Sequence, residues 1–225
     1  MSKKLSLLLV CFALLSVGAV QVLALDLRAE PVEHPNPGPL DRATDLFQGD
    51  LGAEIGIGCS NQSGTIGGPN HLAVSVTSPL AVPFSITSHY YNIFTGVSPT
   101  LTALTFAAWG AGSVPPEPPV AVQTGLDFSN GDHTVAISPL IFIESSQFFF
   151  GQVQPQTSAG YLWGVDTSSG GNGTSFIKAP TCDVSEWVTL TSVGFSGNWV
   201  MSVSVEDVVV PVELSSWGEI KTVWQ

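Results

Sequence analysis

The sequence is poor in basic residues: its 225 residues include six lysines and arginines against 18 aspartates and glutamates. A net charge of −12 cannot supply the basic patch by which proteins bind nucleic acid. The same charge disfavours binding to anionic membrane surfaces. Charge of this size mainly confers solubility, and an acidic chain rich in Ser, Thr and Gly is typical of an extracellular protein.

Cysteine is equally scarce, with three residues in the chain. Cys11 lies in the N-terminal segment, and no two cysteines have the close spacing of a zinc site. Cys59 and Cys182 remain as an even pair in a chain that we expect to be exported, and such a pair predicts a disulfide bond. Two free, buried thiols are the alternative.

The N-terminus lacks an apolar run of the ~20 residues that a membrane span needs. Lys3 and Lys4 precede a shorter apolar run, and Ala24 offers a small residue at a cleavage point. We therefore predict that residues 1–24 are a signal peptide rather than an uncleaved anchor, and that the mature chain is secreted with no membrane contact. Cleavage would leave four basic residues.

Residues 25–54 show no strand pattern, and we expect an irregular, proline-rich leader. Each proline between His34 and Pro39 lacks a donor for strand pairing. Residues 42–47 suggest one helical turn, and the glycine-rich stretch 52–70 suggests irregular loops around Cys59. No strand and helix flank these glycines, so they do not form a dinucleotide-binding motif.

From residue 71 the hydrophobic period becomes two, which is the period of a half-buried strand. Short strands separated by turn signals predict an all-β fold, an antiparallel β-sandwich of jelly-roll type over residues 55–209. Residues 140–153 are the most aromatic and branched stretch, and we expect two strand arms, 140–144 and 147–153, with a bend between them and a central place in a sheet.

Two segments depart from this pattern. The proline-rich residues 114–120 predict a surface loop rather than a linker between domains. In residues 210–225, Ser216 and Glu219 have capping-box spacing, which predicts a short amphipathic helix, with an irregular tail as the alternative. The apolar face of such a helix would pack on this domain, on a partner or on a second copy.

Catalytic patterns are missing, and we expect no enzymatic activity. No Gly-x-Ser-x-Gly elbow is present, and Glu206 and Asp207 are adjacent in a predicted strand, so they point to opposite faces. His71 and His89 are predicted on polar strand faces and His133 at a strand start, with no second metal ligand nearby in sequence.

Two kinds of binding residue can be proposed, and no cofactor is expected apart from a structural calcium ion. Asp127, Asn130 and Asp132 supply oxygen atoms in one turn, the ligand type that calcium prefers, and Asp166 and Asn172 lie in another loop. Most of the six tryptophans should lie in the core. Tyr90, Tyr91 and Trp109 are our candidates for an exposed platform on which sugar rings stack.

Three stretches together resemble the jelly-roll-like β-sandwich modules of secreted and surface proteins of bacteria. They are residues 70–74, the strand pattern 84–91, and residues 160–166, which precede a Gly/Ser loop and a closing strand. The stretch 210–218 resembles tails that end exported bacterial proteins or precede their sorting domains. The resemblance implies the fold and an extracellular setting.

The sequence thus predicts a secreted, non-catalytic binding or adhesion module for a glycan or a cell-surface protein. The alternative is a structural subunit that forms homo-oligomers through its sheet edges or its C-terminal tail. A secreted hydrolase is the remote third reading.

Overall fold

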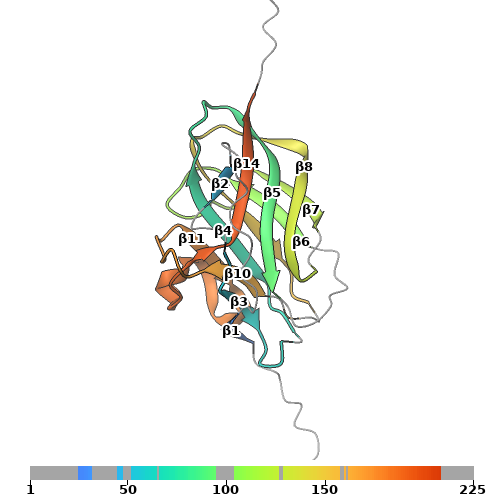
Figure 1. Cartoon of the computed structure of the whole chain (residues 1–225), viewed down its shortest axis with the longest axis vertical. Helices are drawn as coiled ribbons and strands as arrows, with labels where there is room; N and C mark the ends of the chain where they lie inside the picture. The colour runs from blue at the N-terminus through green and yellow to red at the C-terminus, as the bar shows by residue number, and fades with distance from the viewer. Residues whose placement is uncertain are drawn as a thin grey trace, which may run out of the picture.

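The computed structural model describes residues 25–31, 45–47, 52–64, 66–94, 104–126, 129–157, 160 and 162–208. Within them the chain folds into two antiparallel β-sheets that stack as a sandwich (Figure 1). This confirms the all-β sandwich. The predicted signal peptide (1–24) and C-terminal segment (210–225) lie outside the described residues.

An eight-stranded sheet forms one layer. Its strands are β1 (Asp26–Pro31), β2 (Asp45–Phe47), β3 (Ile55–Ser60), β5 (Phe84–Phe94), β8 (Gly131–Ile143), β10 (Leu162–Asp166), β13 (Asn198–Trp199) and β14 (Met201–Asp207). The six-stranded sheet forms the other layer. Its strands are β4 (Asn70–Thr77), β6 (Leu104–Trp109), β7 (Ala121–Leu126), β9 (Gln147–Gln154), β11 (Ser175–Ala179) and β12 (Val184–Thr189).

From β3 onward the chain passes repeatedly from one sheet to the other, as in a jelly roll. After β3, the consecutive strands of the described chain that share a sheet are β6–β7, β11–β12 and β13–β14. Two short 3-10 turns, Pro180–Cys182 and Leu190–Val193, are the helical elements of the described chain. None of the described helical segments has the length and apolar character of a membrane span.

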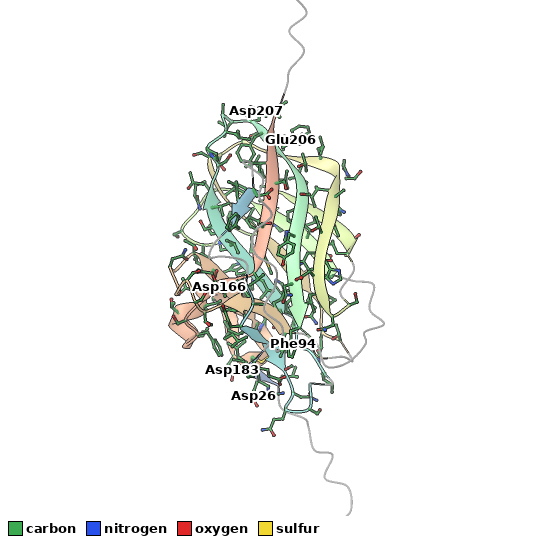
Figure 2. The ribbon with its side chains drawn as sticks, in the orientation of Figure 1. Asp26, Phe94, Asp166, Asp183, Glu206 and Asp207 are labelled. Carbon is green, nitrogen blue, oxygen red and sulfur yellow. A yellow bond between two sulfur atoms is a disulfide. The ribbon has the colours of Figure 1, made fainter. Side chains whose placement is uncertain are left out.

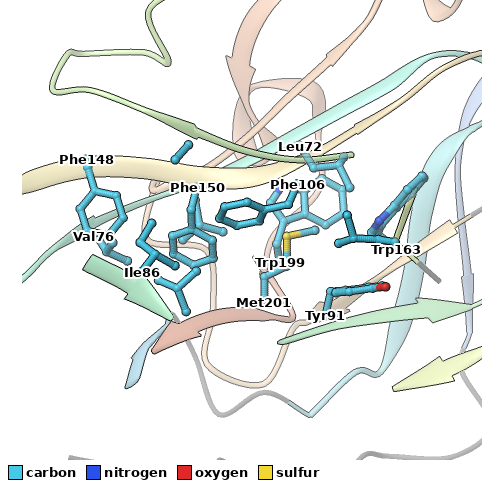
Figure 3. Close-up of a cluster of buried hydrophobic side chains, with 14 of the residues drawn as sticks. Leu72, Val76, Ile86, Tyr91, Phe106, Phe148, Phe150, Trp163, Trp199 and Met201 are labelled. Carbon is cyan, nitrogen blue, oxygen red and sulfur yellow. The ribbon is translucent and has the colours of Figure 1, made fainter. Parts of the chain in front are cut away.

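The core lies between the two sheets, where alternate residues of each strand point inward. Phe106, Phe148 and Phe150 enter from the six-stranded sheet, and Trp163 and Met201 meet them from the eight-stranded sheet (Figure 3). All five are almost completely buried. The prediction that most tryptophans are core residues holds for the four that the structure describes: Trp109, Trp163, Trp187 and Trp199.

The aromatic stretch 140–153 is divided between the two sheets. Its bend confirms the prediction of two arms, because β8 ends at Ile143 and β9 begins at Gln147. The second arm, β9, is central and pairs with β4 and β6. The first arm was wrongly expected to be central too: it ends β8, which pairs with β5 at an edge of the other sheet.

The prediction of an irregular leader over residues 25–54 is wrong where the chain forms β1 and β2, and the loops expected around Cys59 include β3. β1 pairs with β3, and β2 pairs with β14, so the expected helical turn is wrong over Asp45–Phe47. β1 and β2 are the two ends of the strand order, and an edge strand needs apolar residues on one face at most. In β3, Gly56 packs so closely on Leu162 and Phe94 that a side chain would crowd both.

The predicted disulfide between Cys59 and Cys182 is confirmed, with an S–S distance of 2.04 Å. Cys59 belongs to β3 of the eight-stranded sheet, and Cys182 ends the 3-10 turn that follows β11 of the six-stranded sheet. The bond therefore crosslinks the two layers across 123 residues of chain.

Candidate functional site

The predicted aromatic platform of Tyr90, Tyr91 and Trp109 does not exist as a surface. Their exposed fractions are 8%, 0% and 1%. Tyr90 and Tyr91 are neighbours on β5 and so point to opposite faces, while Trp109 ends β6 in the other sheet. The prediction failed because sheet membership, which a local sequence pattern does not contain, separates the three rings.

Tyr90 lies on the outer face of the eight-stranded sheet, beside Ala53 and Val200. Its hydroxyl group donates a 3.0 Å hydrogen bond to Asp132 Oδ1. Burial, and then the negative charge and the hydrogen bond of Asp132, raise the pKa of Tyr90 well above its usual value. Tyr90 is therefore a structural residue, held as a neutral phenol.

Trp109 lies on the outer face of the six-stranded sheet, in a cluster with Phe149, Phe176 and Trp187. The proline-rich loop, residues 110–120, reaches this cluster. Its Glu117 accepts a 3.0 Å hydrogen bond from Trp187 Nε1 and lies 3.5 Å from Lys178 Nζ. The loop joins β6 to β7, which pair with each other, so it is a surface excursion within one sheet, as predicted.

His89 is fully buried in the core, so its predicted place on a polar strand face is wrong. Its Nδ1 lies 3.0 Å from the carbonyl oxygen of Ser202, and its Nε2 lies 3.2 Å from Gln152 Nε2. Trp163 Nε1 donates to Gln152 Oε1. Burial lowers the pKa of His89 to about 3, so the ring is a neutral, structural member of this network.

The other two histidines also have structural neighbours. His71 packs edge-on against Trp187, with ring centroids 6.2 Å apart. Burial, and then the charge of Lys178, lower the pKa of His71. His133 lies near the start of β8, as predicted, and stacks on Tyr91 with ring centroids 5.0 Å apart.

The predicted calcium turn is only partly visible, because Asp127 lies outside the described residues. Asn130 precedes β8, and Asp132 is the second residue of that strand. Asp132 Oδ1 accepts hydrogen bonds from Tyr90 and from Asn92 Nδ2, the latter at 2.7 Å. No cluster of three or more His, Cys, Asp or Glu suited to a metal occurs in the described part of the chain. Calcium binding at this turn stays a prediction.

A groove of about 420 Å³ opens where the edges of the two sheets meet. Gly110 and Val120, at the two ends of the proline-rich loop, line one side. The end of β8 and the bend after it line the other with Phe142, Ile143, Glu144 and Ser145. Phe142 is 57% exposed, so its ring is accessible.

The groove continues into an exposed apolar strip along β7 and β8, which lie on the same side of the sandwich (Figure 1). Val122 of β7 is 53% exposed and Leu140 of β8 is 48% exposed. The amide group of Gln123 joins the two edges: its Nε2 donates to Ala136 O at 3.1 Å, and its Oε1 accepts from Ser138 N at 2.8 Å.

The groove lies at the same end of the sandwich as the last residue of β14. Phe84 of β5 pairs with Ile143 on one side and with Asp207 on the other. The backbones of Ile143 and Asp207 are therefore two strand spacings apart, a distance of about 10 Å. Figure 2 labels Glu206 and Asp207 at the end of β14, so two acidic residues lie at this end of the sandwich.

Sequence reasoning missed this groove, although one signal was present. Leu140 and Phe142 alternate with Ile141 and Ile143 along the strand. If one face of the strand is open to solvent, one of these two pairs is buried and the other is exposed. The sequence pattern does not reveal that β8 is such a strand.

Comparison with known proteins shows a fold and no family. No family model matches the chain, and no curated protein matches it. A similar solved structure is that of the cysteine protease and lectin-like domains of Cwp84, a surface-layer-associated protein of Clostridium difficile. The two share 9% sequence identity with a TM-score of 0.51, over 74% of this chain and 37% of that one. The likeness shows a shared β-sandwich architecture with a part of that protein.

Proposed function

We propose that this protein is a secreted, non-catalytic module that binds a glycan chain in the groove between the β6–β7 loop and the end of β8. The observation that carries the proposal is the Phe142 ring, exposed at the mouth of the groove beside Glu144 and Ser145. Ligand sites typically combine apolar and aromatic walls with a few well-placed polar groups.

The chemistry of a sugar fits these groups. The C–H face of a pyranose ring is apolar and can stack on the Phe142 ring, while its hydroxyl groups remain available at the edge. A carboxylate at Glu144 accepts charge-assisted hydrogen bonds from such hydroxyls. Because the groove lies near Glu206 and Asp207 as well, we expect neutral glycans or amino sugars rather than acidic ones.

Two further observations support an extracellular binding role. The disulfide between Cys59 and Cys182 suits an oxidising compartment outside the cytoplasm. The chain also shares its β-sandwich architecture with part of a solved structure that contains a lectin-like domain of a surface-layer-associated protein. This likeness supports the proposal of a surface module.

We propose that the module is non-catalytic because the groove residues carry a single titratable group, Glu144. Glycoside hydrolysis by the usual mechanisms needs two carboxyl groups flanking the scissile bond. A glycan could therefore be held here without being cleaved.

The test is a glycan array probed with the mature protein, the Phe142→Ala variant and the Leu140→Ala variant. Leu140 is a matched control, because it is exposed on the same strand but does not line the groove. We expect Phe142→Ala to lose at least about 10-fold in affinity, equal to about 1.4 kcal/mol, and Leu140→Ala to bind normally. Absence of binding by the parent protein, or equal binding by both variants, would refute the proposal.

The exposed strip also favours a second candidate, a structural subunit that assembles through its sheet edges. Val122 of β7, Leu140 and Phe142 of β8, and Val120 just before β7 are all 48–60% exposed, and exposed edge strands invite pairing with another chain. Sedimentation over a range of concentrations, with and without residues 210–225, tests this. A monomer throughout would exclude assembly, and oligomers abolished by Val122→Lys would favour it over glycan binding.

A further inference from the structure

The outer face of the six-stranded sheet carries aromatic side chains, although the outer face of a sandwich usually carries polar residues. Trp109, Phe149, Phe176 and Trp187 form a cluster there that is separate from the core between the sheets, and none of the four is more than 8% exposed. We call this cluster the aromatic face. The proline-rich loop contacts it through Glu117.

The two tryptophans of the aromatic face reach toward each other from distant strands. Trp109 stands on β6 and Trp187 on β12, with β9, β4 and β11 between them. Four strand spacings are about 19 Å of sheet, yet the two ring centroids lie 5.5 Å apart. The rings therefore extend over the middle strands, where Ala73, Gly151 and Ala107 are paired neighbours with small side chains or none. One ligand on this face would contact both rings.

The polar groups of the aromatic face are two donors and a cation. Trp187 Nε1 donates its 3.0 Å hydrogen bond to Glu117, which also lies 3.5 Å from Lys178 Nζ. Trp109 Nε1 is buried and has no hydrogen-bond partner. Of the two lysine and arginine side chains in the described chain, Arg28 and Lys178, one lies at this face. These groups suit a ligand that carries a carboxylate and further oxygen acceptors.

Glu117 supplies such a carboxylate from within the chain. Its side chain is 46% exposed, so a competing group in solution can reach it. Near the ends of the loop, Gly112 N donates to Gln147 Oε1 at 3.1 Å, and Val120 N donates to Ala108 O at 2.8 Å. The four prolines between these points have no backbone donor. Glu117 therefore fastens the middle of the loop to the aromatic face.

We propose that the aromatic face is a second binding site, for a sugar that carries a carboxylate, and that the proline-rich loop inhibits it by holding Glu117 in the ligand's place. A uronic acid ring offers a carboxylate to Lys178 and Trp187 Nε1, and its apolar C–H face suits the indole rings. Its hydroxyl groups offer an acceptor to Trp109 Nε1. The loop leaves this last donor unpaired, so the sugar gains a hydrogen bond that the loop lacks.

A free peptide with the chemistry of the loop is the less favoured ligand. Such a peptide would compete with a tethered copy of itself, and tethering gives the loop an effective concentration in the millimolar range. A free ligand must therefore offer an interaction that the loop does not make. The site is also distinct from the groove at Phe142, so it stands or falls independently of glycan binding there.

Titration of the mature protein with trigalacturonate and with its carboxyl-reduced counterpart, followed by tryptophan fluorescence, tests the site. We expect the reduced sugar to bind at least about 10-fold more weakly, because it lacks the charge-assisted contacts. Lys178→Met should weaken trigalacturonate binding by a similar factor. Glu117→Ala should strengthen it about 5-fold or more, because the loop no longer competes. The loss of a merely structural contact would weaken binding instead.

Glu186→Ala is the matched control for charge. It removes the same charge from an exposed position on β12, and as the neighbour of Trp187 it points to the opposite side of the strand. Equal gains in Glu117→Ala and Glu186→Ala would reduce the effect to net charge and overturn the inhibitory role. If Glu117→Ala does not fold, Glu117→Gln takes its place, because it loses the charge but keeps an acceptor for Trp187 Nε1.

Three further outcomes locate the ligand. Trigalacturonate binding that persists in Phe142→Ala supports the aromatic face, and binding lost in that variant would place the acidic sugar in the groove and overturn the proposal. Absence of trigalacturonate binding by both the parent protein and Glu117→Ala would also overturn it. A synthetic peptide of residues 114–120 that binds Glu117→Ala more tightly than trigalacturonate does would replace the sugar by a proline-rich peptide.

Discussion

The aromatic stretch contributes the end of β8 and most of β9, and the phenylalanines of these two strands have different environments. Phe148, Phe149 and Phe150 of β9 are at most 1% exposed, while Leu140 and Phe142 of β8 are 48% and 57% exposed. β9 has a paired strand on each side, and β8 ends a sheet. The position of a strand in its sheet, rather than its hydrophobicity, thus decides whether its aromatic side chains are buried in the core or exposed to solvent.

The largest effect should come from truncating one phenylalanine on each strand. Phe150→Ala removes a side chain from the centre of the core and should lower the free energy of unfolding by about 3–5 kcal/mol. Phe142→Ala removes an exposed ring and should change it by less than about 0.5 kcal/mol. Urea unfolding followed by tryptophan fluorescence measures both, and equal losses would contradict the comparison.

A second contrast concerns two glutamines. Gln152→Leu on β9 leaves Trp163 Nε1 and His89 Nε2 without their partner in the core, which should cost about 1–3 kcal/mol for each group. Gln123→Leu at the β7 edge frees backbone groups of β8 in an exposed setting, where water can replace the amide. We expect a loss below about 1 kcal/mol. A larger loss at Gln123 would indicate that the edges depend on this bridge.

His89 makes the core sensitive to acid. Its folded pKa is about 3 against 6.5 for the free side chain, so the unfolded chain takes up the proton first as the pH falls. Its contribution to stability is complete above pH 6.5 and is lost progressively toward pH 3. The slope should be about 1.4 kcal/mol per pH unit within that window.

The measurement is the unfolding free energy between pH 6.5 and pH 5, where most carboxyl groups remain ionised. His89→Phe should flatten the slope even if it lowers stability overall. An unchanged slope would show that another group is responsible for the acid sensitivity.

The smallest effect is expected at the exposed strip. Val122→Thr preserves the shape of the side chain on an edge strand and should change the unfolding free energy by less than about 0.5 kcal/mol. We expect the Val122→Thr substitution to affect only the association between copies of the protein, and sedimentation at high concentration measures that association. A marked loss of stability would mean that Val122 is covered in solution.

Much of the sandwich was predictable because strand periodicity is local. The alternation over residues 72–77, 83–94 and 100–110 predicts three strands that correspond to β4, β5 and β6. The pairing of Cys59 with Cys182 followed from their number and the expected compartment. The edge strands β1 and β2 were missed because they gain their stability from partners far along the chain, β3 and β14.

The candidate sites were less predictable. The residues chosen from sequence, Tyr90, Tyr91 and Trp109, were selected as aromatic side chains, and in the structure all three are buried. The groove around Phe142 combines segments from separate regions of the chain. No local pattern links Gly110 to Phe142.

By itself the sequence determined an acidic, all-β chain with two cysteines available for one bond, since charge, composition and the two-residue period are properties of neighbouring residues. Only the tertiary structure decided which strands lie at the centre and which at the edges. Sheet order depends on contacts between residues far apart in sequence, and those contacts determine whether a phenylalanine is buried in the core or lines a groove.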